Sequence, residues 1–169
     1  TIKDNHGNEV TVVYLKDVKR HPLNEDLYPR DEHISEINTL AASMQLHYNE
    51  HGYPNHTAIE VCPATGTIMS GNFRSWGAEE NKFKFLYAKV SPTRYDPTLS
   101  DYQQYLQLEK YNLDGKRDES NPVTAVRTYK RKALAYFKEY GKAFSNKMIN
   151  AFAMERGIQP KSFRQMIRI

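Results

Sequence analysis

The sequence has few of the residues that build disulfides, metal clusters or membrane spans. Its 169 residues include a single cysteine, Cys62, and a single tryptophan, Trp76. One thiol cannot close an internal disulfide and gives no metal-cluster spacing, so we expect a reduced Cys62 packed in or near a strand. No run of about 18 apolar residues occurs, which excludes a membrane-spanning helix and a membrane partner. No signal-like apolar stretch opens the chain, so we expect a cytoplasmic protein.

Positive charge is concentrated in the second half of the chain. Residues 1–95 carry ten Lys and Arg against twelve Asp and Glu, whereas residues 96–169 carry fourteen against eight. A positive block beside a nearly neutral block is typical of a protein that touches a polyanion with one part. A helical surface that is basic and merely solvated is the alternative.

The pattern of apolar residues changes at the same place. Before residue 96, β-branched runs alternate with helical spacings, which predicts a small mixed-sheet α+β domain over 1–95. After it the spacing is helical only, which predicts an all-helical domain over 96–169. The expected strands are 9–15, 57–63, 66–71 and 83–91; the expected helices are 31–52, 73–81, 99–112, 121–140, 145–156 and 160–168; and 19–31 is expected to be a loop.

Two separate cores are expected, one for each domain. The first is predicted to contain Ile34, Ile37, Leu40, Met44, Ile59, Val61, Ile68, Leu86 and Val90. The second is predicted to contain Ile149, Phe152, Phe163 and Ile167.

The stretch "TIMSGNFRSWGA" (67–78) joins an expected strand to an expected helix through Gly71. A glycine lets the backbone approach a ligand, and the first amides of a helix carry partial positive charge. Arg74 adds a fork of donors suited to phosphate oxygens. The turn therefore predicts an anion pocket, for the phosphates of a nucleotide or of DNA. In the alternative, Gly71 serves only a tight turn and Arg74 pairs with a nearby carboxylate such as Glu79 or Glu80. Trp76 is expected to serve packing.

Residues 145–168 have the plan of a helix-turn-helix. Ser145 is placed to cap the first helix, a turn follows at 157–159, and Pro160 can open the second helix. In DNA-binding versions of this plan the second helix enters the major groove. An ordinary helical hairpin is the alternative. The expected DNA-binding residues are Arg127, Lys130, Arg131, Lys147, Lys161, Ser162, Arg164, Gln165 and Arg168.

Two other groups of polar residues give weaker indications. His47 and His51 lie four residues apart on an expected helix, with His56 nearby, as in a metal-binding pair. We favour a solvated helix end and predict no metal site. A nuclease could use a group of carboxylates as metal ligands, and a kinase-like enzyme could use one as a base, but these residues also suit the start of a helix. They are Asp26, Asp31, Glu32 and Glu36.

Several of these motifs, in this order, resemble ParB-like proteins. "YLKDVKRHPLN", a helix and "AIEVCPATGTIMSGNFRSWGA" are similar to the ParB N-terminal domain, whose fold is shared with sulfiredoxin. Gly71, Arg74 and Ala78 match its Gly-x-x-Arg turn. Arg117, Pro122 and Tyr129 match the spacing of a second ParB stretch, with Glu109 upstream as in the family. The helix-turn-helix falls where ParB proteins place theirs, so the resemblance covers nearly the whole chain.

The resemblance implies a DNA-binding protein that forms a homodimer and binds a nucleoside triphosphate, CTP or ATP, with Mg²⁺. At the turn, CTP-binding members usually have Gly-Glu-Arg-Arg where this chain has Gly-Asn-Phe-Arg. About one extra helical turn of residues separates Glu109 from Arg117. The sulfiredoxin cysteine is missing from the turn. The nucleotide-binding residues that the resemblance implies are Gly71, Asn72, Phe73, Arg74, Asn24, Arg30, Glu109 and Arg117.

An enzyme of the same family is the alternative function. A ParB-like nuclease or nucleotide hydrolase needs a placed base or a cage of metal ligands. The sequence offers no convincing set of either, so no catalytic residue is assigned and DNA binding is the favoured function.

Overall fold

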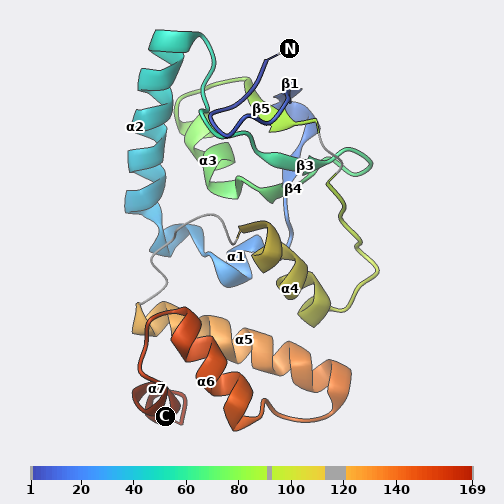
Figure 1. Cartoon of the computed structure of the whole chain (residues 1–169), viewed down its shortest axis with the longest axis vertical. Coiled ribbons are helices and arrows are strands. Elements are labelled where there is room, and N and C mark those ends of the chain that lie inside the picture. Colours follow the sequence, from blue (N-terminus) through green and yellow to red (C-terminus); the bar gives the residue numbers. More distant parts are fainter. Residues whose placement is uncertain (1, 91–92, 113–120, 169) are drawn as a thin grey trace. The chain divides into compact units, whose positions relative to one another are not determined.

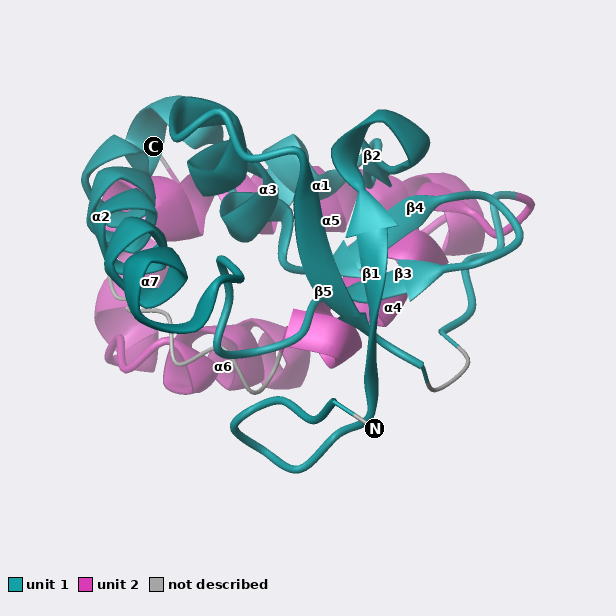
Figure 2. Ribbon diagram, turned by 90° about the horizontal axis from the view of Figure 1, so that it is seen from above, with its two compact units in different colours: residues 1–97 teal, residues 98–169 magenta. Residues whose placement is uncertain are grey.

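The computed structural model describes residues 2–90, 93–112 and 121–168. The chain forms two compact units, residues 1–97 and residues 98–169, which Figures 1 and 2 show. The expected α+β class is confirmed, because the first unit combines strands with helices and the second contains helices. Across the described ranges, no helix has the length and apolar character to span a membrane.

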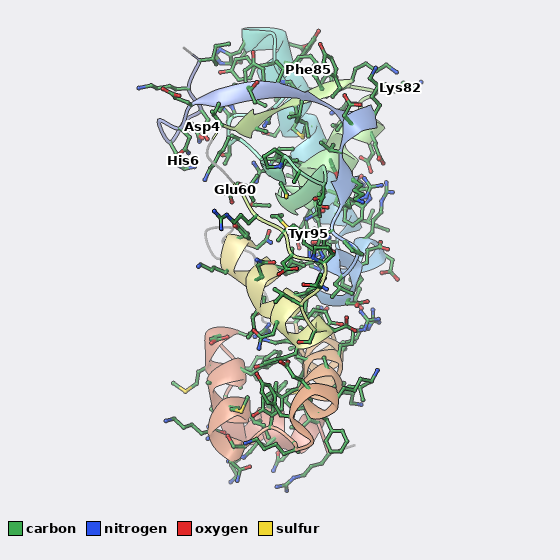
Figure 3. The ribbon with its side chains drawn as sticks, turned by 90° about the vertical axis from the view of Figure 1, so that its right-hand side faces the viewer. Asp4, His6, Glu60, Lys82, Phe85 and Tyr95 are labelled. Carbon is green, nitrogen blue, oxygen red and sulfur yellow. The ribbon has the colours of Figure 1, made fainter. Side chains whose placement is uncertain are left out.

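In the described residues of the first unit, short strands form one two-stranded and one three-stranded sheet. β1 pairs antiparallel with β5, while β4 pairs parallel with β2 and antiparallel with β3. A bridge between Ile59 and Ala88 connects the two sets of strands. In the turn before β1, the carboxylate of Asp4 accepts hydrogen bonds from the amides of His6 and Ala58, which ties this turn to the start of β3 (Figure 3). The strands are β1 (Val10–Tyr14), β2 (Lys19–Arg20), β3 (Glu60–Cys62), β4 (Thr67–Ser70) and β5 (Phe85–Lys89).

Helices α2 and α3 pack closely against each other (Figure 1). A Cβ at Gly77 would lie 3.1 Å from Sδ of Met44, so the small residue permits this approach. α2 ends at Gly52, whose φ of +80° is the left-handed conformation that glycine adopts at helix ends. The helical elements of this unit are η1 (Leu15–Asp17), α1 (Asn24–Leu27), η2 (Arg30–Glu32), α2 (Ile34–His51) and α3 (Asn72–Glu80).

The expectation of a loop over 19–31 is wrong in part, because β2, α1 and η2 lie there. Leu27 and Tyr28 are buried, and the ring of Tyr28 packs edge-on against Phe73. Contacts with distant residues thus order a segment whose prolines and asparagine favour turns.

Most of the expected first core is confirmed. Ile68 of β4 and Leu86 of β5 are buried in one cluster with Met44 of α2. Ile37 of α2 is fully buried as well. Ile34 and Val90 are wrong, since both side chains are 54% exposed. Ile34 is the first residue of α2, and Val90 follows the last residue of β5, so both lie at the ends of their elements. The expected burial of Cys62 is confirmed in β3.

In the part of the second unit that the structure describes there are four helices, two of which begin at a side-chain cap. Asn121 and Ser145 cap their helices by accepting hydrogen bonds from backbone amides. Phe152 and Phe163 stack with ring centroids 5.4 Å apart, and the expected core is confirmed except that Ile167 is only half-buried. The helices are α4 (Asp101–Asn112), α5 (Pro122–Tyr140), α6 (Asn146–Glu155) and α7 (Pro160–Met166).

Candidate ligand pocket and basic helical surface

The Gly71 turn has a packing reason for its glycine. Gly71 has a φ of +105°, and a Cβ at this position would overlap the side chain of Ile59. Both the left-handed backbone and the close approach of Ile59 therefore require glycine. These two constraints account for the residue independently of any ligand.

The next two residues of the turn, Asn72 and Phe73, make contacts with other parts of the first unit. Oδ1 of Asn72 accepts a hydrogen bond from the amide of His21 (3.1 Å), and its Nδ2 donates to the carbonyl of Ile68 (3.3 Å). Phe73 is buried and its ring lies 5.0 Å from that of His33. The start of α3 thus holds the segment that follows β2.

Arg74 donates hydrogen bonds to main-chain carbonyls. Its Nη1 contacts the oxygens of Thr57 (2.5 Å) and Ala58 (2.9 Å), just before β3. The carboxylates of Glu79 and Glu80, which were the expected partners of Arg74 in the alternative, pair with other arginines. A contact between Arg74 and a phosphate stays a prediction.

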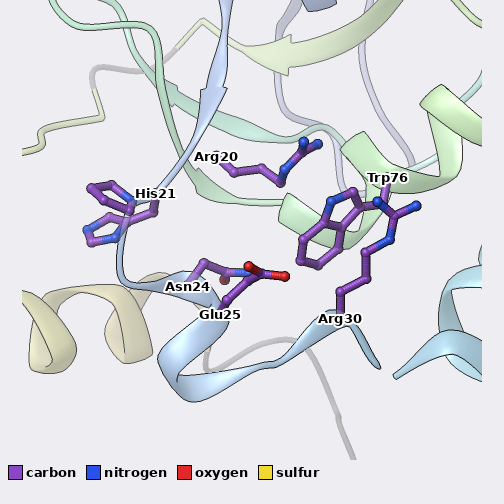
Figure 4. Close-up of a pocket in the computed structure, with 7 residues that line it drawn as sticks. Arg20, His21, Asn24, Glu25, Arg30 and Trp76 are labelled. Carbon is purple, nitrogen blue, oxygen red and sulfur yellow. The ribbon is translucent and has the colours of Figure 1, made fainter. Parts of the chain in front are cut away.

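A pocket of about 290 Å³ lies beside α3 and α1, and we call it the Trp76 pocket (Figure 4). It brings together Asn24 and Arg30, two of the residues expected to bind nucleotide, and adds residues that sequence reasoning did not assign to a ligand. The lining residues are Arg20, His21, Pro22, Asn24, Glu25, Arg30 and Trp76.

Two arginines, Arg20 and Arg30, lie over the ring of Trp76. The guanidinium carbons of Arg20 and Arg30 lie 5.1 Å and 5.3 Å from the centroid of the Trp76 ring, within the range of a cation–π contact. Arg20 pairs with Glu79 at 2.9 Å, and Arg30 pairs with Glu80 at 3.9 Å. These guanidinium groups give the pocket planar donors that match phosphate oxygens.

Two buried polar side chains in the Trp76 pocket lack partners. Asn24 is 1% exposed, and neither its Oδ1 nor its Nδ2 has a hydrogen-bond partner within the described residues. His21 is 2% exposed; its Nδ1 accepts from the amide of Leu23 at 3.0 Å, while its Nε2 has no partner in the same part of the chain. Burial lowers the pKa of His21 to about 4, so the ring is neutral at pH 7. Because Nδ1 accepts, the ring proton is on Nε2.

Glu109 and Arg117 are the two remaining residues that were expected to bind nucleotide. Glu109 belongs to α4 in the second unit, where its carboxylate lies 2.8 Å from Nζ of Lys132 on α5. Arg117 lies outside the described residues.

The basic block of the second unit divides into buried and surface residues. Lys132 and Arg156 are buried beside the ring of Phe152. Nζ of Lys132 lies 5.4 Å and the guanidinium carbon of Arg156 lies 3.5 Å from the ring centroid. Arg164 donates a hydrogen bond to Asn150. Charge counted along the sequence therefore overstates the charge at the surface. Of the expected DNA-binding set, the exposed members are Lys130, Lys147, Lys161, Gln165 and Arg168, and the half-buried members are Arg127, Arg131, Ser162 and Arg164.

The histidines near the end of α2 form a packed group. His47 is 3% exposed, and its ring centroid lies 3.4 Å from that of His56 and 4.4 Å from that of His51. The expectation of a solvated helix end is therefore wrong for His47, because the loop that carries Tyr53 and His56 folds over it. Within the described ranges, no group of three or more His, Cys, Asp or Glu is arranged to hold a metal ion. Of the acidic residues considered as ligands, Glu36 pairs with His33 at 2.9 Å.

Comparison with known proteins identifies the fold. No protein-family model matches the sequence, and no curated protein matches it significantly. A solved structure described as the C2221 form of a Pnob8-like ParB-N domain is similar, with a TM-score of 0.54 and 12% sequence identity. The match covers 94% of this chain and 67% of that one. The expected ParB-like architecture is thereby confirmed: the chain has the fold of a ParB-N domain.

Proposed function

We propose that this chain is a ParB-like DNA-binding protein that also holds the phosphates of a nucleotide in the Trp76 pocket. The ParB-N fold supports a role of this class. The observation that carries the proposal is the placement of charge: exposed basic residues on short helices in one unit, and paired arginines in a pocket in the other.

The α6–α7 hairpin carries the proposed DNA contact. Gly157, with a φ of +68°, turns the chain between the helices, and the stacked Phe152 and Phe163 fix their packing. Lys161 and Arg168 remain exposed on α7 and just beyond it. Side chains of these types contact phosphates and base edges, which suits α7 to the recognition position of a helix-turn-helix.

Charge reversal tests the DNA contact. The double variant Lys161→Glu/Arg168→Glu is compared with Lys16→Glu/Lys84→Glu, which makes the same change of charge at exposed positions of the first unit. We expect the first variant to lower the affinity for a 30-base-pair duplex at least about tenfold in fluorescence anisotropy, because it removes two phosphate contacts and adds repulsion. The second variant should bind nearly as wild type. Equal losses in both variants would reduce the effect to net charge and overturn the assignment of α7.

The nucleotide phosphates fit the Trp76 pocket better than the amides of residues 72–74. Gly71, Asn72 and Phe73 are all buried, so a ligand could reach their amides only by displacing protein. Arg30 and Arg20 already line an open volume of about 290 Å³. Mg²⁺ would accompany a triphosphate there, since it is usually bound through substrate phosphates.

Removal of one arginine tests the phosphate site. Arg30→Ala should weaken the binding of a nucleoside triphosphate with Mg²⁺ by about 1.5 to 3 kcal/mol, the usual contribution of a hydrogen bond to a charged group. Titration calorimetry measures this change, and Lys82→Ala, at an exposed position after α3, is the control. A wild-type protein that binds neither CTP, ATP nor GTP at millimolar concentration would contradict the proposal.

A further inference from the structure

We propose that the open edge of β1, with the apolar face beside it, binds an extended acidic segment of a partner protein as an added strand. The residues of this surface belong neither to the proposed DNA contact nor to the Trp76 pocket, so the proposal is independent of both. Three features of the first unit support it: main-chain groups that point away from β5, a row of exposed apolar side chains, and basic residues at one end of the strand.

The main chain of β1 has an open side at Val12 and Tyr14. In the antiparallel pair with β5, the amide of Leu15 donates a hydrogen bond to the carbonyl of Lys84. Main-chain groups alternate between the two sides of a strand, so those of Val12 and Tyr14 point away from β5. Among the strands of the described residues, only β5 is paired with β1. Two residues of β1 therefore present donors and acceptors to a further strand.

The beginning of the same edge already holds an extended segment. The amide of Val10 donates to the carbonyl of Ile2, and Lys3 forms an antiparallel bridge with Glu9. This contact shows that a strand fits along the edge, and it stops before Val12. A second copy of the chain paired antiparallel here would bring its own η1 toward the Ile2 segment. A single extended peptide has no such folded part, so it fits the remaining edge better.

The face of β1 that turns away from the core is apolar. Val13 packs against the core cluster, so Val12 and Tyr14 project from the opposite face, where they are 42% and 52% exposed. The register places Tyr87 and Phe85 of β5 opposite them, which continues the apolar row. The five residues of β1, VTVVY, carry no charge. Uncharged edges beside exposed apolar side chains are typical of strands that another chain joins.

Basic residues at the end of β1 favour an acidic partner. Lys16 directly follows the Leu15 that pairs with Lys84, and both lysines are exposed. Lys82 is also exposed and lies beyond the same end (Figure 3), whereas Asp17 offsets one of the three charges. The amino end of an antiparallel added strand would lie here. Acidic residues near the amino end of the partner segment would therefore complement the surface.

Binding of a designed peptide to the full chain tests the proposal. The probe is the acetylated and amidated peptide Glu-Glu-Thr-Val-Thr-Val-Thr, whose valines share one side of an extended chain. In an NMR titration we expect it to shift the amide resonances of Val12 and Tyr14 and to slow their hydrogen exchange, with a dissociation constant below about 1 mM. The same peptide with Lys-Lys in place of Glu-Glu should bind at least about tenfold more weakly.

Methylation of the peptide backbone separates strand addition from simple apolar contact. Two versions of the probe carry N-methyl groups on alternate amides, one on the odd and one on the even positions. Only every second amide of an added strand faces β1, so one version should bind as the probe does and the other at least about tenfold more weakly. Equal affinities of the two versions would overturn the proposal.

Two substitutions at one position test the edge itself. Val12→Pro removes an outward N–H, a change that edge strands accommodate, and should weaken probe binding at least about tenfold. Val12→Thr keeps the N–H and should bind within about threefold of the wild type. If Val12→Pro does not fold, Lys16→Glu/Lys84→Glu provides the test, because it should bind the Lys-Lys peptide more tightly than the Glu-Glu peptide.

Two further outcomes would overturn the proposal. If the resonances of Val12 and Tyr14 do not respond to millimolar probe, the edge does not accept a peptide strand. If sedimentation velocity shows self-association that Val12→Pro abolishes and the probe does not displace, the edge belongs to a second copy of the chain.

Discussion

The two units use their basic residues in different ways. In residues 1–97, Arg20 and Arg30 lie against the buried Trp76 and pair with carboxylates of α3 at 2.9 and 3.9 Å. In residues 98–169, exposed residues such as Lys161 and Arg168 project from the surface of short helices. The first arrangement holds its guanidinium groups in place through ring and carboxylate contacts, whereas the exposed cations of the second are open to solvent and to counterions.

This difference predicts different ligands for the two units. A pocket with positioned guanidinium groups and uncharged partners selects a small molecule by shape and hydrogen bonds. An open basic surface attracts any polyanion, and it gains specificity only where side chains reach base edges. A pocket and an open surface should therefore differ in their response to pH, to salt and to the loss of a single basic residue.

The largest expected effect concerns the stability of the first unit at acid pH. The folded pKa of His21, about 4, lies below the ordinary value of 6.5. The unfolded chain therefore binds a proton between pH 6.5 and 4 that the folded ring does not, and stability falls as the pH falls through this range. Between pH 7 and pH 4.5 this contribution amounts to about 2 to 3 kcal/mol.

Urea unfolding of the wild type and of His21→Gln at the two pH values measures this effect. Other titrating groups are common to both proteins, so the difference between the two pH dependences isolates His21. An identical pH dependence would mean that burial does not lower the folded pKa of His21.

A basic residue of the second unit should matter for stability and leave DNA binding unchanged. The side chains of Lys132 and Glu109 are 8% and 20% exposed, with Nζ and Oε1 2.8 Å apart. Lys132→Met leaves the carboxylate without this cation, which should cost about 2 to 3 kcal/mol because the pair is largely buried. Lys130→Met, its exposed neighbour, should change the stability by less than about 0.5 kcal/mol.

DNA affinity of the same two variants completes this test. Lys132→Met should bind duplex DNA as the wild type does once the measurement is made well below its melting temperature. A loss equal to that of Lys161→Glu/Arg168→Glu would show that the division into buried and surface basic residues is wrong.

Salt should affect the two proposed ligands to different degrees. With about four phosphate contacts, DNA affinity should fall about 10²-fold between 50 and 200 mM salt, since each contact releases counterions. Nucleotide affinity should fall by less than about tenfold over the same range, because a nucleotide would contact two arginines of the pocket whereas the duplex contacts more cations. Anisotropy and calorimetry in the same buffers measure both slopes, and equal slopes would argue that both ligands bind the surface.

Local patterns in the sequence predicted the elements of the fold well. Helix caps such as Ser145, and alternating runs such as that of β5, depend on residues that are neighbours in the chain. The segment 19–31 was predicted as a loop because the residues that order it are distant in the sequence. The Asn72 side chain bonds the amide of His21, and Phe73 packs on Tyr28, across a separation that no local pattern reports.

The sequence predicted individual residues of the candidate site, but it could not predict which residues lie together in the pocket. Arg30 and Asn24 followed from the family resemblance, and the structure places both in one pocket. The partnership of Arg20 with Trp76 joins residues 56 positions apart, so it required the fold. Lys132 belongs to the basic block of the sequence, and no local pattern there indicates that it lies beside the ring of Phe152.

The smallest expected effect concerns Arg74, which was predicted to bind an anion and which the structure places on backbone carbonyls. Its Nη1 donates to the oxygens of Thr57 and Ala58, and Ala58 is buried, so Arg74→Ala leaves a buried acceptor without this donor. We expect a loss of about 1 to 2 kcal/mol in the free energy of unfolding. Arg74→Lys should recover part of it, because an ammonium group can reach one carbonyl but cannot present the guanidinium fork. Nucleotide affinity should change far less than in Arg30→Ala, since the anion is proposed to lie in the Trp76 pocket. Thermal melting without ligand and calorimetry with nucleotide separate the two roles. An Arg74→Ala protein with wild-type melting temperature and lost nucleotide affinity would return the anion to the start of α3, and the pocket proposal would fail.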